Sequence, residues 1–368
     1  MPVRPEAGAE LTRVLTELPG NPSGSHGAAR AARRVLDDAR DVLADVLGSG
    51  PGDVVFTGGG TEADNLAVLG ASTDGSVVVS SIEHPAVRDP AVGLGAHVAP
   101  VDAAGRIDLD ALAALLEDVD EVSLVSVMLV NNEVGAIQPL DAVAEVVRCH
   151  APDAVLHTDA VQALSWVEVA EAAAGADLIS VSAHKFGGPK GVGALVGRPG
   201  VALTARQVGG GQERERRSGT QNVAGIAAMA TAAQITADHR ADDVARIAAL
   251  RDRLADGLLA AVPDAVETGV KGGDRSGRAA GLCHLCFPGV EAEALLFLLD
   301  QAGVAASAAS SCASGAAEPS AVLAAMGVPR DQAAGSLRLS LGWATTDADV
   351  DLALQVVPDA VEQLRAPR

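Results

Sequence analysis

The stretch ISVSAHKFGGPKGVG (residues 179–193) runs from an apolar, strand-like segment through Ser-Ala-His-Lys into a glycine-rich loop. Lys185 stands where a buried strand would end, and burial disfavours the charged form of a lysine. Either Lys185 extends to solvent, or its amine is held uncharged for chemistry. A surface lysine would leave the flanking Ser-Ala-His and Gly-Gly-Pro-Lys-Gly as coincidence, so the second interpretation is favoured.

Apolar runs typical of buried strands recur along the first part of the chain, at residues 53–57, 76–81, 121–130, 154–159, 177–182 and 193–197. Most are nearly continuous Val, Ile and Leu, as expected when both faces of a sheet are covered. Helical stretches such as 106–119 and 140–151 lie between them. This alternation predicts an α/β fold with a largely parallel sheet.

The pattern changes after about residue 222. Residues 223–262 contain neither glycine nor proline between Ile226 and Arg253, which predicts one long helix or two nearly continuous ones. Beyond it, strand-like segments at 281–289 and 335–343 and a final amphipathic helix predict an α+β domain. We expect a large domain at 8–239 and a small domain made of 240–368 together with 1–7. The small domain is expected to carry the loop around Cys312.

The composition excludes several classes of protein. The chain of 368 residues is 48% hydrophobic and 20% charged, with a formal net charge of −21, which argues against nucleic acid or an anionic membrane surface as partner. It contains no apolar span of about 20 residues, and its first residues lack a signal-peptide core. We expect a cytoplasmic protein that binds a small substrate or a basic partner.

Four cysteines in a chain of this length do not indicate a disulfide framework. Cys283 and Cys286 lie in CHLC, within a segment that has the pattern of a strand. Positions i and i+3 of a strand point to opposite faces, so these thiols should not share a metal ion. We expect buried, unreactive thiols and no metal site.

Polar residues follow the apolar runs at the points where they end. These are GGGTEADN after 53–57, His84 after 76–81, Asn131, Asn132 and Glu133 after 121–130, Asp159 at the end of 154–159 with Gln162 after it, and His184 and Lys185 after 177–182. Open parallel sheets bind ligands at the carboxyl ends of their strands. The five clusters are therefore predicted to lie along one edge of the sheet.

Three of these positions have alternative interpretations. The glycines and helix start of FTGGGTEADN (56–65) suit a phosphate, or Thr61 simply caps the helix. Asp159 ends a buried run and needs a cationic partner, or it caps a following helix. His84 also suits a capped core histidine. Together with Lys185 they match pyridoxal phosphate, which has a phosphate, an aldehyde and a basic ring nitrogen.

Two further residues lie in the second part of the chain. Cys312 stands in ASAASSCASGAAEP (306–319), a stretch of small residues with the pattern of an exposed loop, which favours a nucleophilic over a structural cysteine. In GSLRLSLGW, Leu337, Leu339 and Leu341 share one strand face and Arg338 points to the other. Its guanidinium suits capture of a carboxylate, or a surface ion pair.

The sequence resembles the cysteine desulfurases of the NifS/IscS type, in the class V aminotransferase family of pyridoxal-phosphate enzymes. The resemblance spans nearly the whole chain, and the motifs SAHKFGGPKGVGAL and GGGQER look actinobacterial. It is carried by GNPSGSH (20–26), FTGGGTEADN, SIEHPAV (81–87), VNNEVGAIQP (130–139), HTDAVQ (157–162), SAHKFGGPKGVGAL, GGGQERERRSGTQN (209–222), the Cys312 loop and SLRLSLG. It implies fold type I, with a mostly parallel seven-stranded sheet in the large domain and a smaller α+β C-terminal domain.

The resemblance also implies roles for individual residues. Lys185 would hold the cofactor as a Schiff base, Asp159 would pair with its ring nitrogen, and His84 would stack on the ring. Gln162 would bind the phenolic oxygen, and Asn132 would lie beside the ring and the substrate carboxylate. The phosphate would be bound by Gly60, Thr61, Ser182 and His184, and by Thr220 of the other subunit of a homodimer.

The implied activity is an L-cysteine desulfurase, in which Lys185, Cys312 and His84 are catalytic. Arg338 would bind the carboxylate of cysteine, and the amine of Lys185 would remove its α-proton. The thiolate of Cys312 would then take the sulfur as a persulfide and leave alanine. A sulfur-acceptor protein in iron–sulfur assembly or thiolation would receive it, and Cys312 is also a candidate for a transient iron–sulfur ligand.

Two alternatives stay open. A selenocysteine lyase or another C–S lyase of this fold would not strictly need Cys312. A non-catalytic scaffold that binds the cofactor is the other, because the Asn-Ala-Ala-Thr-Thr-like turn with which family chains open is absent and PVRPEA stands at the start. The loop also reads SSCASG where relatives commonly have Gly-Ser-Ala-Cys-Thr-Ser.

Overall fold

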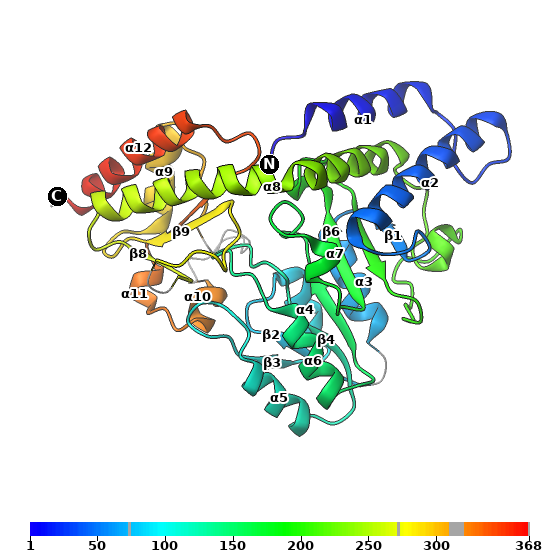
Figure 1. Cartoon of the computed structure of the whole chain (residues 1–368), viewed down its shortest axis with the longest axis horizontal. Coiled ribbons are helices and arrows are strands. Elements are labelled where there is room, and N and C mark those ends of the chain that lie inside the picture. Colours follow the sequence, from blue (N-terminus) through cyan, green and yellow to red (C-terminus); the bar gives the residue numbers. More distant parts are fainter. Residues whose placement is uncertain (73–74, 271–272, 309–319, 367–368) are drawn as a thin grey trace. The chain divides into compact units, whose positions relative to one another are not determined.

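The computed structural model describes residues 1–72, 75–270, 273–308 and 320–366 (Figure 1). The chain divides into two compact units. Unit 1 comprises Met1–Ala99, Asp108–Val130 and Gln138–Arg240, and unit 2 comprises Pro100–Ile107, Asn131–Ile137 and Ala241–Arg368. The roles expected for the two parts, cofactor binding and delivery of the cysteine loop, stay predictions.

Unit 1 contains a seven-stranded sheet with the strand order β1-β7-β6-β5-β4-β2-β3. Strands β2 to β6 are parallel to one another where they pair, whereas β7 is antiparallel to both β1 and β6. The α/β prediction with a mostly parallel sheet is confirmed. The strands are β1 (Val54–Thr57), β2 (Ser76–Ser80), β3 (His97–Ala99), β4 (Val122–Ser126), β5 (Val155–Asp159), β6 (Leu178–Ser182) and β7 (Gly193–Gly197).

The six apolar runs all form strands of this sheet, but β3 was not predicted. It is a short edge strand in which His97 and Val98 are exposed and only Ala99 is buried. A three-residue strand with one buried position carries no pattern that could be recognised in the sequence. The run at 121–130 is also shorter as a strand than expected, because β4 ends at Ser126.

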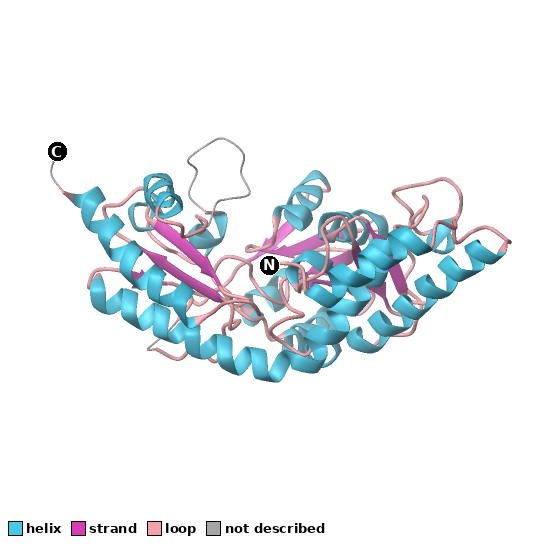
Figure 2. Ribbon diagram, turned by 90° about the horizontal axis from the view of Figure 1, so that it is seen from above, coloured by secondary structure: helices cyan, strands magenta, loops and turns pink. Residues whose placement is uncertain are grey.

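Helices cover the sheet, and in Figure 2 its strands lie between them. The helices of unit 1 are α1 (Pro5–Glu17), α2 (Gly27–Leu47), α3 (Gly60–Ala71), α4 (Pro85–Gly93), α5 (Leu109–Asp118), α6 (Leu140–His150) and α7 (Val169–Ala172). Leu66 and Val68 of α3 pack with Val77 of β2 and Leu195 of β7 in one buried cluster. Burial of this apolar area holds α3, and therefore its N-terminal glycines, against the sheet.

The long helix predicted after residue 222 is a single helix, α8 (Val223–Ala261), which runs from unit 1 into unit 2. Unit 2 contains a three-stranded antiparallel sheet of order β10-β9-β8. Its strands are β8 (Val266–Glu267), β9 (Leu282–Cys286) and β10 (Ser336–Ser340), and its helices are α9 (Ala292–Gln301), α10 (Ala321–Ala325), α11 (Arg330–Ala333) and α12 (Asp347–Arg365). In the described part of the chain, no helix combines the length and apolar character needed to span a bilayer.

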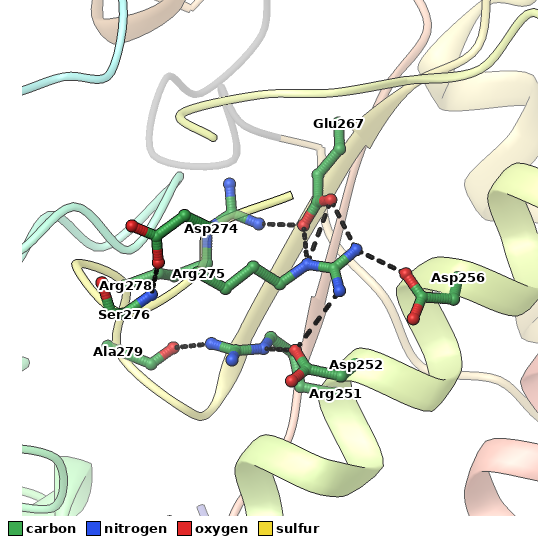
Figure 3. Close-up of polar contacts among 9 residues, drawn as sticks. All are labelled: Arg251, Asp252, Asp256, Glu267, Asp274, Arg275, Ser276, Arg278 and Ala279. Atoms are coloured by element: carbon green, nitrogen blue, oxygen red, sulfur yellow. Dashed lines mark hydrogen bonds and ion pairs between the residues drawn. The ribbon is translucent and has the colours of Figure 1, made fainter. Parts of the chain in front are cut away.

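A buried ion cluster joins β8 to α8 within unit 2 (Figure 3). The carboxylate of Glu267 accepts hydrogen bonds from Arg278 Nη1 at 2.5 Å and from Arg275 Nη2 at 2.8 Å. Arg275 Nη2 also lies 2.7 Å from Asp256, and its Nη1 lies 3.6 Å from Asp252. The side chain of Arg278 is only 2% exposed, so its charge depends on Glu267 for compensation.

We predict that Glu267→Gln lowers the free energy of unfolding by about 3 kcal/mol, because it leaves the buried Arg278 without an opposite charge. Urea unfolding followed by circular dichroism measures the change. The control is Asp264→Asn, which breaks the ion pair to Arg365 at a carboxylate that is 56% exposed and should cost less than about 1 kcal/mol. Equal stability of the two variants would contradict the prediction.

Candidate functional site

The carboxyl ends of the central strands of unit 1 lie at one edge of the sheet. Gly193 of β7 pairs with Thr57, the last residue of β1, and with Ser182, the last residue of β6. Strands β2, β4, β5 and β6 are parallel, so their last residues point to the same edge. Gly60, His84 and Lys185, which follow β1, β2 and β6, and Asp159, the last residue of β5, therefore lie at the same edge, as predicted for four of the five strand-end clusters. The fifth cluster, Asn131–Glu133, belongs to unit 2.

Lys185 lies in a short 3₁₀ turn, Ala183–Lys185, directly after β6, and is half-buried. Its charge contributes to the lowered pKa of His84 and of His184, although burial is the larger cause in both. It also favours the ionised form of Asp159. A single amine that affects three groups lies among them. The structure thus brings Lys185, Asp159, His84 and His184 together.

Asp159 is the last residue of β5 and only 4% exposed. Burial raises its pKa to about 6, while the N–H of Val161, 2.8 Å from Oδ1, and the charge of Lys185 favour the carboxylate. The alternative in which Asp159 caps a following helix is wrong, because residues 161–166 are turns. A buried carboxylate in this position favours a cationic partner in front of it.

The N-terminus of α3 lies close to the loops after β5 and β6. A Cβ added at Gly60 would stand 2.6 Å from Val161 Cγ2 and 3.3 Å from Ser182 Cβ, so only glycine permits this approach. The cap of α3 is Gly59, so the alternative in which Thr61 caps the helix is wrong; Thr61 lies exposed in the first turn. The first N–H groups and the dipole of this helix favour an anion here.

The two histidines at this edge are neutral and oriented by hydrogen bonds. His84 is half-buried and is the N-cap of α4, and its Nδ1 accepts the N–H of Ala86 at 3.1 Å. Of the capped core histidine considered as an alternative, the structure thus shows the hydrogen bond at a helix end but not the core position. Ser182 Oγ lies 2.9 Å from Nδ1 of His184, whose pKa burial lowers to about 4. Neutral rings add no positive charge to that of Lys185.

Two acidic residues and a histidine beneath the site were missed by the sequence analysis. Asp64 of α3 is 1% exposed, and its Oδ1 lies 3.7 Å from Nε2 of the fully buried His157. Burial, followed by the charge of Asp159, raises the pKa of Asp64. His157 also contacts Ser126 Oγ at 2.8 Å and Ser180 Oγ at 3.0 Å, and burial lowers its pKa to about 3.

Glu83 is the second missed acid and precedes His84 in the chain. Its Oε1 accepts a hydrogen bond from Ser80 Oγ at 2.6 Å and from the N–H of Met128 at 2.8 Å. Its Oε2 is buried with no hydrogen-bond partner among the residues that the structure describes. Burial raises the pKa of Glu83 to about 8. A protonated Glu83 thus ties the loop that carries His84 to the segment after β4.

The only sequence signal for Asp64, Glu83 and His157 is their place inside or beside apolar runs, in TEADN, IEHP and HTDA. A polar residue in such a run is often exposed at a strand or helix end. Burial depends on how the elements pack, which the pattern does not state.

Unit 2 contains two of the residues expected to contact substrate. Arg338 Nη1 donates a hydrogen bond to the backbone oxygen of Asn132 at 2.9 Å. Arg338 of β10 pairs in register with His284 of β9, while Leu337 and Leu339 are buried on the other face. His284 is fully buried, its pKa lies at about 3 because of burial, and its Nδ1 lies 2.7 Å from Thr268 Oγ1. A neutral histidine therefore stands beside the guanidinium of Arg338.

The remaining expected site residues lie as follows. Gln162 is half-buried in the turn after β5, and Thr220 is exposed before α8. Cys312 lies outside the described residues. Cys283 and Cys286 are buried on β9, and burial raises the pKa of each thiol to about 12. Among residues that the structure describes, no group of three His, Cys, Asp or Glu is arranged to hold a metal ion.

The pKa of Glu83 predicts a dependence of stability on pH. In the folded state its pKa is about 8 instead of 4.5, so the stabilisation is complete below about pH 4.5 and is lost as the pH rises towards 8. In cofactor-free protein, the free energy of unfolding of the unmodified chain should fall relative to that of Glu83→Gln by a few kcal/mol over this range. Urea unfolding at pH 5 and pH 8 measures it.

Glutamine can accept the same two hydrogen bonds and does not titrate, which makes it the matched replacement for a protonated glutamate. Glu145→Gln, at an exposed position of α6, is the control and should leave the pH dependence unchanged. Parallel pH curves for the unmodified chain and Glu83→Gln would contradict the prediction.

Comparisons with known proteins confirm the resemblance stated from the motifs. The class-V aminotransferase family matches residues 4–353. An IscS-like cysteine desulfurase of Mycobacterium tuberculosis is 45% identical over 378 residues, covering 99% of this chain and 95% of the relative. A cysteine desulfurase of Cereibacter sphaeroides is 42% identical over 375 residues, covering 98% of this chain and 94% of the relative.

Solved structures agree with this result. A NifS-like protein has a TM-score of 0.90 and 32% identity, and the match covers 99% of this chain and 97% of that protein. The likeness includes the fold expected for type I enzymes. The chain therefore belongs to the class-V aminotransferase family and, within it, to the IscS/NifS-like cysteine desulfurases.

Proposed function

We propose that the chain converts L-cysteine into L-alanine with pyridoxal phosphate as cofactor and collects the sulfur as a persulfide on Cys312. The observation that supports this most is the charge of Lys185 acting on the buried carboxylate of Asp159 at the carboxyl ends of parallel strands. An amine that can bind an aldehyde and an acid that can bind a ring nitrogen are the two groups that this cofactor requires.

The residues at this edge fit the cofactor chemically. Lys185 is the covalent attachment point, Asp159 the partner of the ring nitrogen, and His84 the ring that stacks on it. Gln162 binds the phenolic oxygen. The phosphate is bound at the N-terminus of α3, where Gly60 lies close to Ser182 and the first N–H groups of the helix favour an anion. The further phosphate ligands in this proposal are Thr61, His184 and Thr220 of a second copy of the chain.

Bound pyridoxal phosphate supplies an electron sink for charge that develops at the substrate α-carbon. The amine of Lys185, once it has released its own proton, removes the α-proton of the substrate. Arg338 and Asn132 bind the substrate carboxylate. Asp159 stays ionised as long as a positive group faces it.

The sulfur transfer balances without an external oxidant. The C–S bond of L-cysteine breaks and an S–S bond to Cys312 forms, while the β-carbon receives a proton and becomes the methyl group of L-alanine. Cys312 begins as a thiol and ends as a persulfide. A second protein of the class that accepts sulfur from persulfides must remove it, for iron–sulfur assembly or for thiolation. The working form in this proposal is a homodimer.

The test is Cys312→Ser. We expect the visible absorbance of the lysine-bound cofactor to persist and the formation of alanine from L-cysteine to fall by at least about 100-fold, because serine cannot accept the sulfur. Spectroscopy and an alanine assay measure both. Lys185→Ala, which should lose the visible absorbance, is the control for the spectrum.

Unchanged sulfide release by Cys312→Ser would contradict the proposed reaction. If the unmodified chain forms alanine from selenocysteine but not from L-cysteine, and Cys312→Ser keeps that activity, the chain is a selenocysteine lyase instead. If the unmodified protein binds pyridoxal phosphate and forms no alanine, it is a cofactor-binding scaffold.

A further inference from the structure

A buried ion pair anchors an irregular segment of unit 1, Gly209–Gln221. The side chain of Glu213 is 1% exposed, and both of its oxygens accept hydrogen bonds from Arg40 of α2, at 2.9 Å each. Glu213 Oε2 also accepts the N–H of Phe56 at 3.1 Å. Arg40 lies over the ring of Phe56, 4.6 Å from its centroid. The segment is thus attached to both α2 and β1.

The backbone at this anchor is strained. Glu213, Arg214 and Glu215 have φ values of 49°, 56° and 64°, in the left-handed region that side chains other than glycine rarely adopt. This conformation is disfavoured for such residues because it brings Cβ too close to the following carbonyl oxygen. Three in a row persist only where the surroundings determine the conformation, and strain of this kind is often found next to functional positions.

The side chains of Gln212 and Glu213 reach both neighbours of Thr220. Gln212 Oε1 accepts the N–H of Gly219 at 2.7 Å, and Glu213 Oε1 accepts Gln221 Nε2 at 3.2 Å. Thr220 itself is exposed. The two contacts fix the backbone immediately before and the side chain immediately after an exposed hydroxyl.

We propose that Gln212 and Glu213 are positioning residues that hold Thr220 ready to bind the cofactor phosphate of a second copy of the chain. This inference rests on the homodimer of the proposed function. The segment contains Gly209, Gly210, Gly211 and Gly219, and ordering a free backbone costs conformational entropy at every residue. A segment that is already ordered in the single chain binds its target without that cost.

A purely structural role makes a different prediction. If the contacts of Gln212 and Glu213 only stabilise unit 1, their loss lowers stability and affects cofactor binding independently of Thr220. If they act through Thr220, their effect on cofactor binding disappears once the hydroxyl of Thr220 is gone. A double-mutant cycle separates the two roles.

The experiment measures the dissociation constant of pyridoxal phosphate by absorbance titration of the full chain after removal of its cofactor. Thr220→Ala should weaken binding by at least about tenfold, because a hydrogen bond to a charged phosphate is lost. Gln212→Ala should weaken it by about fivefold or more. In the Thr220→Ala background, Gln212→Ala should change it by less than about twofold.

Gln212→Ala is the main variant because it removes a contact without leaving a buried charge. Glu213→Gln unpairs the buried Arg40 and is compared only after its circular dichroism matches that of the unmodified chain. Glu215→Gln is the matched control: it removes the same charge from an exposed side chain in the same strained turn, and binding should stay within about twofold.

Two results would overturn the inference. If Gln212→Ala weakens binding equally with and without Thr220, or in neither background, the contacts do not act through Thr220, and the proposed activity is unaffected. If Thr220→Ala leaves the dissociation constant unchanged, the contact between subunits is wrong as well. Alanine formation by the unmodified chain tests the activity separately from both.

Discussion

The site depends on one electrostatic constraint, which is that Asp159 carries its carboxylate at a buried position in front of Lys185. Burial alone would favour the protonated acid, and its pKa of about 6 reflects that cost. The amine and one backbone N–H supply the opposing stabilisation. The positive charge of Lys185 therefore stabilises the carboxylate of Asp159. The same carboxylate would stabilise a cationic ring nitrogen bound there.

The sheet creates this constraint through its strand directions. Because β5 and β6 are parallel, Asp159 and Lys185 leave the sheet at the same edge, and β7 aligns the end of β1 with that of β6. Burial raises the pKa of Glu83 to about 8, so this acid adds little negative charge to that of Asp159 near neutral pH, and burial followed by the charge of Asp159 also raises the pKa of Asp64.

Much of the fold was accessible from the sequence, because continuous apolar runs and the glycine-free stretch of α8 report directly on burial and helix length. The positions of Asp159 and Lys185 at strand ends followed from the same pattern. The short edge strand β3, the glycine cap of α3 at Gly59, and the buried roles of Asp64 and Glu83 did not follow, because each depends on tertiary packing. Cys312 lies outside the described residues, so its role stays a prediction.

The most direct test of the central claim is Asp159→Asn, which keeps the shape of the side chain and removes its charge. The account predicts that this variant still binds pyridoxal phosphate and forms alanine from L-cysteine at least about 100-fold more slowly, since the ring nitrogen loses its anionic partner. Asp153→Asn, at an exposed position before β5, is the control and should retain full activity. An Asp159→Asn variant with activity within about twofold of the unmodified chain would contradict the account.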